Sequence, residues 1–378
     1  MAVGKKAHPA RAKITATTES VPSPFVFVIC QHGVEPTIKS AIMSTGGQLR
    51  LAFSRPGLLT FKVANPHTMK TAAIETLLEP VRWAIRLWGW SMGGIRGTDV
   101  AVMLGEIAKL PTLEGLGPWG ACHVFPRDRS LPGFRGFEPG PDLLCHAIGE
   151  QFARALPDLP PCNHVARLGE RVLDVVLVEP HHWLIGWHHA DRQEYTWPGG
   201  VYRPDEPAEI ISRAYRKMAE AVAWSRLPIR PGDAIVEIGS APGGAAQRLL
   251  ELGLHVVGVD PAEMDSRILQ HPHFEHWRGK SAAIKRRRFA RFPWLAADMN
   301  VAPNYTLDAV EDLVVYPTSN FRGLLLTLKL SSYSLADRFD SYIQRVQSWG
   351  FDRVELRQLG HNRREVCLVA ENNQPNTG

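Results

Sequence analysis

Three glycines in one short loop are the first residues that point to a bound small molecule. The run Glu237-Ile-Gly-Ser-Ala-Pro-Gly-Gly244 follows an apolar stretch over 234–238 and opens a helical pattern. Glycines at 239, 243 and 244 let the backbone turn tightly and approach a ligand, as at the carboxyl ends of strands in doubly wound sheets. Asp260 ends the next expected strand, where a carboxylate accepts hydrogen bonds from a ribose diol. The loop therefore predicts a nucleoside-like cofactor.

The same loop departs from the dinucleotide fingerprint. Its spacing is not GxGxxG, and Pro242 precludes the usual turn that cradles a pyrophosphate. This favours a cofactor without a diphosphate and disfavours an NAD-dependent oxidoreductase. Asp260 fits S-adenosylmethionine and NAD equally, so it does not separate them, and a strand–glycine loop–helix could also be only a turn.

Further motifs share one half of the chain with this loop. They are Ser212-Arg-Ala-Tyr-Arg-Lys217, Asp298-Met, Thr-Leu-Lys329-Leu and Asn362-Arg-Arg-Glu365-Val. With the Ser-Ala-Pro-Gly-Gly loop, they resemble the FtsJ-type RNA 2′-O-methyltransferases, and within them the RlmM-like bacterial enzymes that methylate a cytidine of 23S ribosomal RNA. The resemblance covers residues 207–370. It implies S-adenosylmethionine as the cofactor and RNA as the partner.

The resemblance also implies the site residues. The catalytic tetrad would be Lys217, Asp298, Lys329 and Glu365. The cofactor would contact Glu237, Gly239, Ser240, Ala241, Pro242, Gly243, Gly244, Asp260 and Asp298. A ribose hydroxyl is a weak acid, so the enzyme must position the oxygen and help to remove its proton. Lys329 would be the base or would steer the oxygen; burial and a neighbouring Lys217 lower the pKa of a lysine, whereas two carboxylates raise it, and the sequence leaves the sign of the net shift open.

Two family features are missing. The aspartate that usually binds the adenine amino group has no counterpart in His276-Trp-Arg-Gly-Lys-Ser281, and Ala245 stands where an aromatic residue commonly follows the glycine pair. Adenine contacts must then come from the backbone or from other side chains. A non-catalytic RNA-binding protein with a degenerate methyltransferase domain is therefore one alternative. The same reaction on transfer RNA or on a messenger RNA cap is another.

A basic run without acids lies after the third expected strand of this half. Its charged residues are Lys280, Lys285, Arg286, Arg287, Arg288 and Arg291. Such a run is often only a solvated surface, but beside a catalytic face it predicts contacts with RNA phosphates. His181, His182, His188 and His189 lack an accompanying Cys or acid cluster, so we expect no metal. The tryptophan-rich segment over 83–90 predicts core rather than a base-stacking surface, and residues 93–97 predict a loop.

The elements that must position these residues divide near 197–207, where Pro and Gly gather. Beyond it, strands alternate with helices, which predicts a Rossmann-like, mostly parallel seven-stranded sheet covered on both faces, with its last two strands antiparallel. Before it, an α+β pattern predicts a ferredoxin-like unit, with a helix over 68–87 and an irregular stretch over 115–141. The expected division is a disordered basic arm (1–20), a ferredoxin-like subdomain (21–95), a THUMP-like RNA-binding domain (96–200), the methyltransferase domain (207–372) and a flexible tail (373–378).

Composition sets wider limits. The 378 residues are 44% hydrophobic and 21% charged, with a formal net charge of +5, which permits a polyanionic partner without requiring one. No apolar run approaches the ~20 residues that span a bilayer. Five scattered cysteines without a CxxC motif favour reduced thiols and a cytoplasmic location. The sequence does not predict the oligomeric state.

Overall fold

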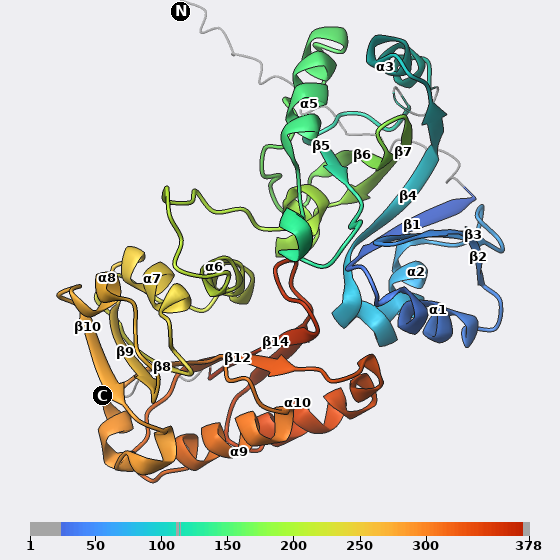
Figure 1. The fold of residues 1–378 in the computed structure, drawn as a ribbon. Coiled ribbons are helices and arrows are strands. Elements are labelled where there is room, and N and C mark those ends of the chain that lie inside the picture. Colours follow the sequence, from blue (N-terminus) through green and yellow to red (C-terminus); the bar gives the residue numbers. More distant parts are fainter. Residues whose placement is uncertain (1–23, 111–112, 114, 373–378) are drawn as a thin grey trace, which may run out of the picture.

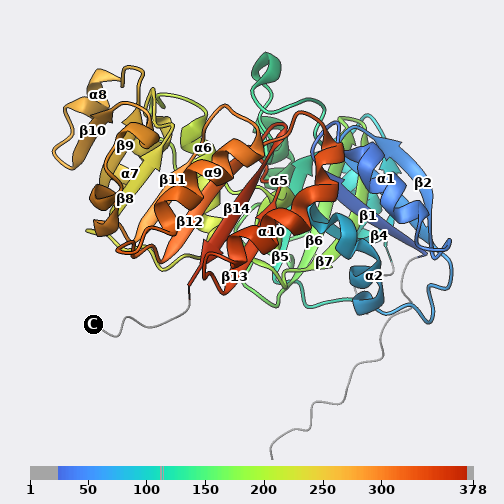
Figure 2. The ribbon, with the colours of Figure 1, turned by 90° about the horizontal axis from the view of Figure 1, so that it is seen from below.

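The computed structural model describes residues 24–110, 113 and 115–372, which form two units, each built on a seven-stranded sheet (Figures 1 and 2). The basic arm expected over 1–20 and the tail expected over 373–378 lie outside the described residues. In the described part of the chain, no helix is both long enough and apolar enough to cross a membrane.

The N-terminal sheet has the strand order β2-β3-β1-β4-β7-β6-β5. Its strands are β1 (Phe25–Cys30), β2 (Leu49–Arg55), β3 (Leu58–Val63), β4 (Ile85–Arg96), β5 (Ala121–Pro126), β6 (Arg171–Glu179) and β7 (His182–His189). The first part of β4 pairs with β1 and its second part pairs with β7. The residues predicted to form a ferredoxin-like subdomain (21–95) and a THUMP-like domain (96–200) therefore share one continuous sheet.

Helices border this sheet, and three of the expectations for this region are wrong. The helices are α1 (Glu35–Met43), α2 (Thr71–Leu78), α3 (Val100–Ala108) and α5 (Leu143–Ala155), with 3-10 turns η1 (Glu79–Ala84) and η2 (Phe134–Gly136). The helix expected over 68–87 ends at Leu78 because Pro80 cannot continue it. Most of the expected loop at 93–97 belongs to β4, and the stretch expected to be irregular over 115–141 contains β5, which pairs in parallel with β6.

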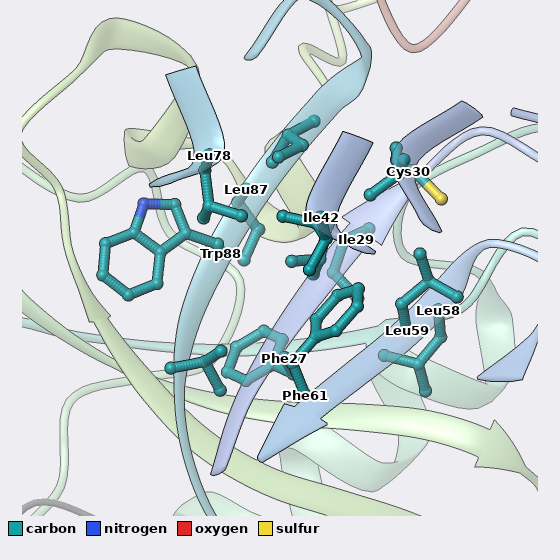
Figure 3. Close-up of a cluster of buried hydrophobic side chains, with 14 of the residues drawn as sticks. Phe27, Ile29, Cys30, Ile42, Leu58, Leu59, Phe61, Leu78, Leu87 and Trp88 are labelled. Carbon is teal, nitrogen blue, oxygen red and sulfur yellow. The ribbon is translucent and has the colours of Figure 1, made fainter. Parts of the chain in front are cut away.

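The tryptophans of β4 belong to the core, as expected. Trp88 and Trp90 are 6% and 3% exposed. Figure 3 shows Trp88 and Leu87 close to Phe27 and Ile29 of β1 and to Leu78 of α2. Five consecutive residues of β1 are buried, and they pack in one cluster with residues of β3 and β4. Apolar side chains on both faces of the sheet therefore fix it against its helices.

The C-terminal sheet has the strand order β10-β9-β8-β11-β12-β14-β13 and follows the predicted pattern. Its strands are β8 (Ala234–Ile238), β9 (His255–Asp260), β10 (Phe274–Arg278), β11 (Trp294–Ala297), β12 (Gly323–Lys329), β13 (Arg353–Arg357) and β14 (Glu365–Glu371). All neighbouring pairs are parallel except those of β14, which lies between β12 and β13 and runs antiparallel to both. The predicted mostly parallel sheet is thus confirmed.

Helices cover both faces of this sheet (Figures 1 and 2). They are α6 (Ala214–Ser225), α7 (Gly244–Glu251), α8 (Ser266–Leu269), α9 (Pro303–Val314) and α10 (Phe339–Gln347), with 3-10 turns η5 (Ser281–Ala283), η6 (Arg286–Arg291) and η7 (Tyr333–Arg338). Two further 3-10 turns, η3 (Gln193–Thr196) and η4 (Pro198–Gly200), contact β4 of the N-terminal sheet. Leu324 and Leu326 of β12 pack in the cluster of α9 and α10, whereas Leu325 packs in that of α6 and α7. The first helix of this unit, α6, begins at Ala214, beyond the Pro- and Gly-rich division near 197–207.

Candidate active site

The glycine loop joins β8 to α7 at the carboxyl edge of the sheet. Gly239 and Gly243 have φ angles of +80° and +114°, which side chains with a Cβ rarely adopt. A Cβ on Gly239 would lie 2.7 Å from the carbonyl oxygen of Asp298, and one on Gly244 would collide with the Ser212 side chain. Glycine is therefore required here because the loop packs closely against the end of β11 and the segment before α6.

Acidic side chains surround the loop. Asp260, at the end of β9, accepts hydrogen bonds from the backbone N–H of Ala241 (3.1 Å) and of Ala262 (2.8 Å). Glu237 is 2% exposed and accepts a hydrogen bond from the Ser240 hydroxyl at 2.8 Å. Burial, with smaller contributions from the charges of Asp298 and Asp260, raises the pKa of Glu237 from 4.5 to about 8. The loop is an acidic environment, which suits a cation and not a pyrophosphate.

The four residues of the expected tetrad meet in one closed ring of alternating charge. The Nζ atom of Lys329 lies 2.6 Å from Asp298 Oδ1 and 2.6 Å from Glu365 Oε2. On the other side, Lys217 donates to Asp298 Oδ2, and its Nζ lies 3.2 Å from Glu365 Oε1. The residues come from α6, the end of β11, the end of β12 and the start of β14. The antiparallel register pairs Lys329 directly with Glu365, which brings the beginning of β14 to the edge where β12 ends.

The ring determines the protonation states of its members. Burial lowers the pKa of Lys329, but the charges of Asp298 and Glu365 outweigh burial and raise it overall. Burial raises the pKa of both carboxyls, yet the two lysine charges lower each of them below the ordinary value. The sequence left open whether the pKa of Lys329 is raised or lowered, and the net shift is upward. Without substrate, the ring therefore holds two ammonium groups and two carboxylates.

The loop before Glu365 is held by residues that the sequence did not single out. The Glu220 carboxylate of α6 accepts hydrogen bonds from the backbone N–H of Gly360 and of His361, each at 2.9 Å. The Asn362 amide oxygen accepts one from Leu359 N–H at 2.9 Å, and its nitrogen lies 3.5 Å from Glu365 Oε1. A buried acid on a helix gives no sequence signal of such a role, although Asn362 belongs to the motif that carries Glu365.

The N-terminal unit contributes to the same loop. Gln31, just after β1, donates from its side chain to the Asn362 carbonyl and accepts a hydrogen bond from Gln358 at 2.8 Å. Arg357 is 4% exposed and its guanidinium lies 2.7 Å from the Glu194 carboxylate. Figure 1 shows the red segment before β14 reaching toward the N-terminal unit. The loop that positions Glu365 therefore rests on both units.

The basic run lies on the surface, and part of its charge is already paired. Its charged side chains are all exposed, namely Lys280, Lys285, Arg286, Arg287, Arg288 and Arg291. Arg286 pairs with Asp312 at 2.7 Å, and Arg291 pairs with Glu275 at 3.0 Å. The Arg288 guanidinium lies 3.9 Å from the centre of the Trp277 ring and 3.6 Å from Glu275. For Lys280, Lys285 and Arg287, no acidic partner is found among the described residues.

Comparisons with known proteins find curated relatives that share one name. No family model matches the chain. "Ribosomal RNA large subunit methyltransferase M" of Laribacter hongkongensis is 28% identical over 46% of this chain and 51% of its own length. The protein of the same name from Alkalilimnicola ehrlichii is 33% identical over 46% of this chain and 49% of its own length. These matches span about half the length of the curated relatives.

Another match is longer, and one solved structure is worth noting. The protein of that name from Xylella fastidiosa is 27% identical over 91% of this chain and 97% of its own length. A Burkholderia thailandensis 1,6-didemethyltoxoflavin-N1-methyltransferase, solved with S-adenosylhomocysteine, covers 43% of this chain and 79% of its own, with 15% identity and a TM-score of 0.34, too low to carry an argument. The sequence matches confirm the resemblance: the chain is similar, over nearly all its length, to a ribosomal RNA large subunit methyltransferase M.

Proposed function

We propose that the chain transfers a methyl group from S-adenosylmethionine to a ribose 2′-hydroxyl of RNA, and that the substrate is a cytidine of large-subunit ribosomal RNA. The observation that carries this proposal is the closed ring of Lys217, Asp298, Lys329 and Glu365 beside the glycine loop. The printed names of the relatives support the ribosomal substrate. The five cysteines, all free, fit a cytoplasmic location.

The residues around the loop fit the proposed cofactor. S-adenosylmethionine supplies an electrophilic methyl group on a positively charged sulfur. Asp260 and Asp298 place two acidic side chains around the loop, and these attract a cation and repel the diphosphate of NAD, whereas the raised pKa of Glu237 keeps that carboxyl mostly uncharged at neutral pH. Asp260 is the acid available to a ribose diol, since it ends β9 at the carboxyl edge of the sheet. No acid takes the place of the missing adenine ligand in 276–281, so backbone groups or other side chains must contact the adenine.

The charge state of Lys329 favours orientation over proton abstraction. Its raised pKa keeps the ammonium charged at neutral pH, so it donates a hydrogen bond to the 2′-oxygen and points a lone pair at the methyl carbon. As the new C–O bond forms and the C–S bond breaks, the electron pair stays on sulfur and the hydroxyl proton becomes strongly acidic. A carboxylate of lowered pKa then suffices to accept that proton, and Asp298 and Glu365 are both in reach of Lys329.

The test is methyl transfer to unmodified RNA. Large-subunit ribosomal RNA transcribed in vitro is incubated with the protein and labelled S-adenosylmethionine, and nuclease-resistant dinucleotides identify ribose methylation. We expect label at a cytidine with the wild type, and at least a 10²-fold lower rate with Lys329→Met. Lys62→Met, an exposed lysine on β3, is the matched control and keeps full activity. Cofactor binding without transfer to any RNA would instead identify a non-catalytic binding protein.

A further inference from the structure

Three buried polar side chains converge inside the N-terminal sheet, away from the ring of charges. They are His123 on β5, Asp174 on β6 and His188 on β7. Their exposed fractions are 0%, 0% and 2%, and one ligand atom of each lies within 4.8 Å of the other two. Strand pairing explains part of this convergence, because His123 and Asp174 are direct partners in the parallel β5–β6 ladder.

Both histidines are held in the same way. His123 Nε2 lies 3.0 Å from the His164 carbonyl oxygen, and His188 Nε2 lies 2.8 Å from the Tyr195 carbonyl oxygen. A carbonyl only accepts hydrogen bonds, so each Nε2 must carry the hydrogen, which leaves Nδ1 with a lone pair in a neutral ring. A backbone carbonyl on the far nitrogen is the usual arrangement that orients a metal-binding histidine.

Two buried polar atoms of the cluster lack a hydrogen-bond donor. His123 Nδ1 and Asp174 Oδ1 are buried and have no hydrogen-bond partner. His123 Nδ1 is an acceptor because the hydrogen of the ring is committed to Nε2, and Asp174 Oδ1 is an acceptor when the carboxyl group is ionised. A protonated His188 would neutralise Asp174 through its 2.6 Å contact with Oδ2, but it would leave these two acceptors unsatisfied. Two buried acceptors without a donor are costly, and a cation between them removes that cost.

We propose that His123, Asp174 and His188 bind one divalent transition-metal ion, and that this ion is zinc. Two imidazole nitrogens and one carboxylate oxygen form a ligand set typical of zinc, whereas magnesium and calcium prefer oxygen alone. The ion makes contact through Nδ1 of each histidine, and the Asp174 carboxylate, now 2.6 Å from His188, turns toward it. The other histidines of the β7 hairpin, at 181, 182 and 189, are not part of the cluster.

The ion would act as a structural link. Through His164 and Tyr195 it fixes two loop carbonyls to the β5–β7 part of the sheet. Tyr195 adjoins Glu194, which pairs with Arg357 of the C-terminal unit. A metal buried to this degree is acquired as the chain folds, so its binding energy adds to the stability of the N-terminal unit. This proposal does not depend on the methyltransferase activity.

The test begins with the metal content of the whole chain. The protein is produced without a histidine tag or chelator in zinc-supplemented medium, and metals are measured by plasma mass spectrometry. We expect about one zinc per chain. Removal with a strong chelator should lower the melting temperature by about 5–10 °C, and added zinc should restore it. Less than about a tenth of an equivalent of any transition metal, with a melting temperature indifferent to zinc and chelator, would overturn the proposal and leave a buried water between the acceptors.

Variants and a spectroscopic probe locate the ion. Asp174→Asn and His123→Gln should lose the zinc, whereas His189→Gln, on the same strand as His188 but outside the cluster, should keep it. If the first two do not fold, Co²⁺ bound to the wild-type apoprotein still decides, since the visible bands of a four-coordinate site with three protein ligands and one water are expected. A six-coordinate spectrum, or zinc retained by both cluster variants, would refute this assignment.

Discussion

Replacing Glu237 with glutamine tests how the acidic loop tolerates a buried carboxyl group. The side chain is 2% exposed, and burial is the largest cause of its raised pKa. Glutamine has nearly the same shape and retains an oxygen that accepts from the Ser240 hydroxyl, but it never ionises. The variant therefore isolates the charge of Glu237 from its packing.

The expected magnitude follows from the two pKa values. In the unfolded chain Glu237 ionises near 4.5, and in the folded chain it ionises near 8. Because the folded pKa is the higher one, the stabilising effect is fully present below pH 4.5 and is lost as the pH rises to about 8. At 1.36 kcal/mol per pH unit, the wild type loses about 4 kcal/mol relative to Glu237→Gln between pH 5 and pH 8. The variant is expected to be the more stable protein at pH 8.

Urea unfolding at pH 5 and at pH 8, followed by circular dichroism, measures this difference. Glu263→Gln, whose side chain is 84% exposed, is the matched control and should follow the wild type. A cationic cofactor favours the ionised Glu237, so wild-type affinity for S-adenosylmethionine should rise with pH from 6 to 8, whereas that of Glu237→Gln should stay constant. Parallel pH dependences of stability in wild type and Glu237→Gln would show that the reasoning about this buried carboxyl is wrong.

Three further outcomes are expected. If Lys329 orients the oxygen, the rate of transfer stays within about twofold from pH 7 to pH 9; a tenfold rise per pH unit would identify it as the base. Arg357→Leu leaves Glu194 buried without its partner and should reduce the free energy of unfolding by about 3–5 kcal/mol in urea titrations, while Arg357→Lys should lose less. Arg287→Ala should lower the slope of log affinity for RNA against log salt by about 1, as should Lys280→Ala, and an unchanged slope in both would place the RNA elsewhere.

The C-terminal half was largely predictable because local patterns and tertiary structure agree there. Buried parallel strands give uniform apolar runs, and the apolar stretch noted over 234–238 matches β8. The ring was recognisable through the resemblance, since Lys217, Asp298 and Lys329 each lie in a short motif. The direction of the pKa shift of Lys329 could not be predicted from the sequence, because the balance of burial against two carboxylates depends on distances of a few ångströms.

The N-terminal half was less predictable, for identifiable reasons. The helix expected over 68–87 runs into β4, whose first seven residues, 85–91, are all buried, so alternation disappears from its sequence. The segment of β5 is surrounded by Gly and Pro, which hide its six buried residues. The cluster at His123 could not be inferred because Asp174 and His188 lie far from it along the chain. The expectation of no metal rested on the β7 hairpin alone.

The position of Glu365 has a consequence for how this protein is built. The ring of four charged side chains takes one of its members, Glu365, from the end of a loop. That loop is held by Gln31 and Glu194 of the N-terminal unit and by Glu220 of the C-terminal unit. The two units are therefore not interchangeable modules joined by a linker. A chain reduced to residues 207–372 would keep its glycine loop, Lys217, Asp298 and Lys329 in place. The loop that positions Glu365 would lose the N-terminal side chains that hold it. An N-terminal unit taken from a distant relative would support Glu365 only if the contacting residues of both units were exchanged together.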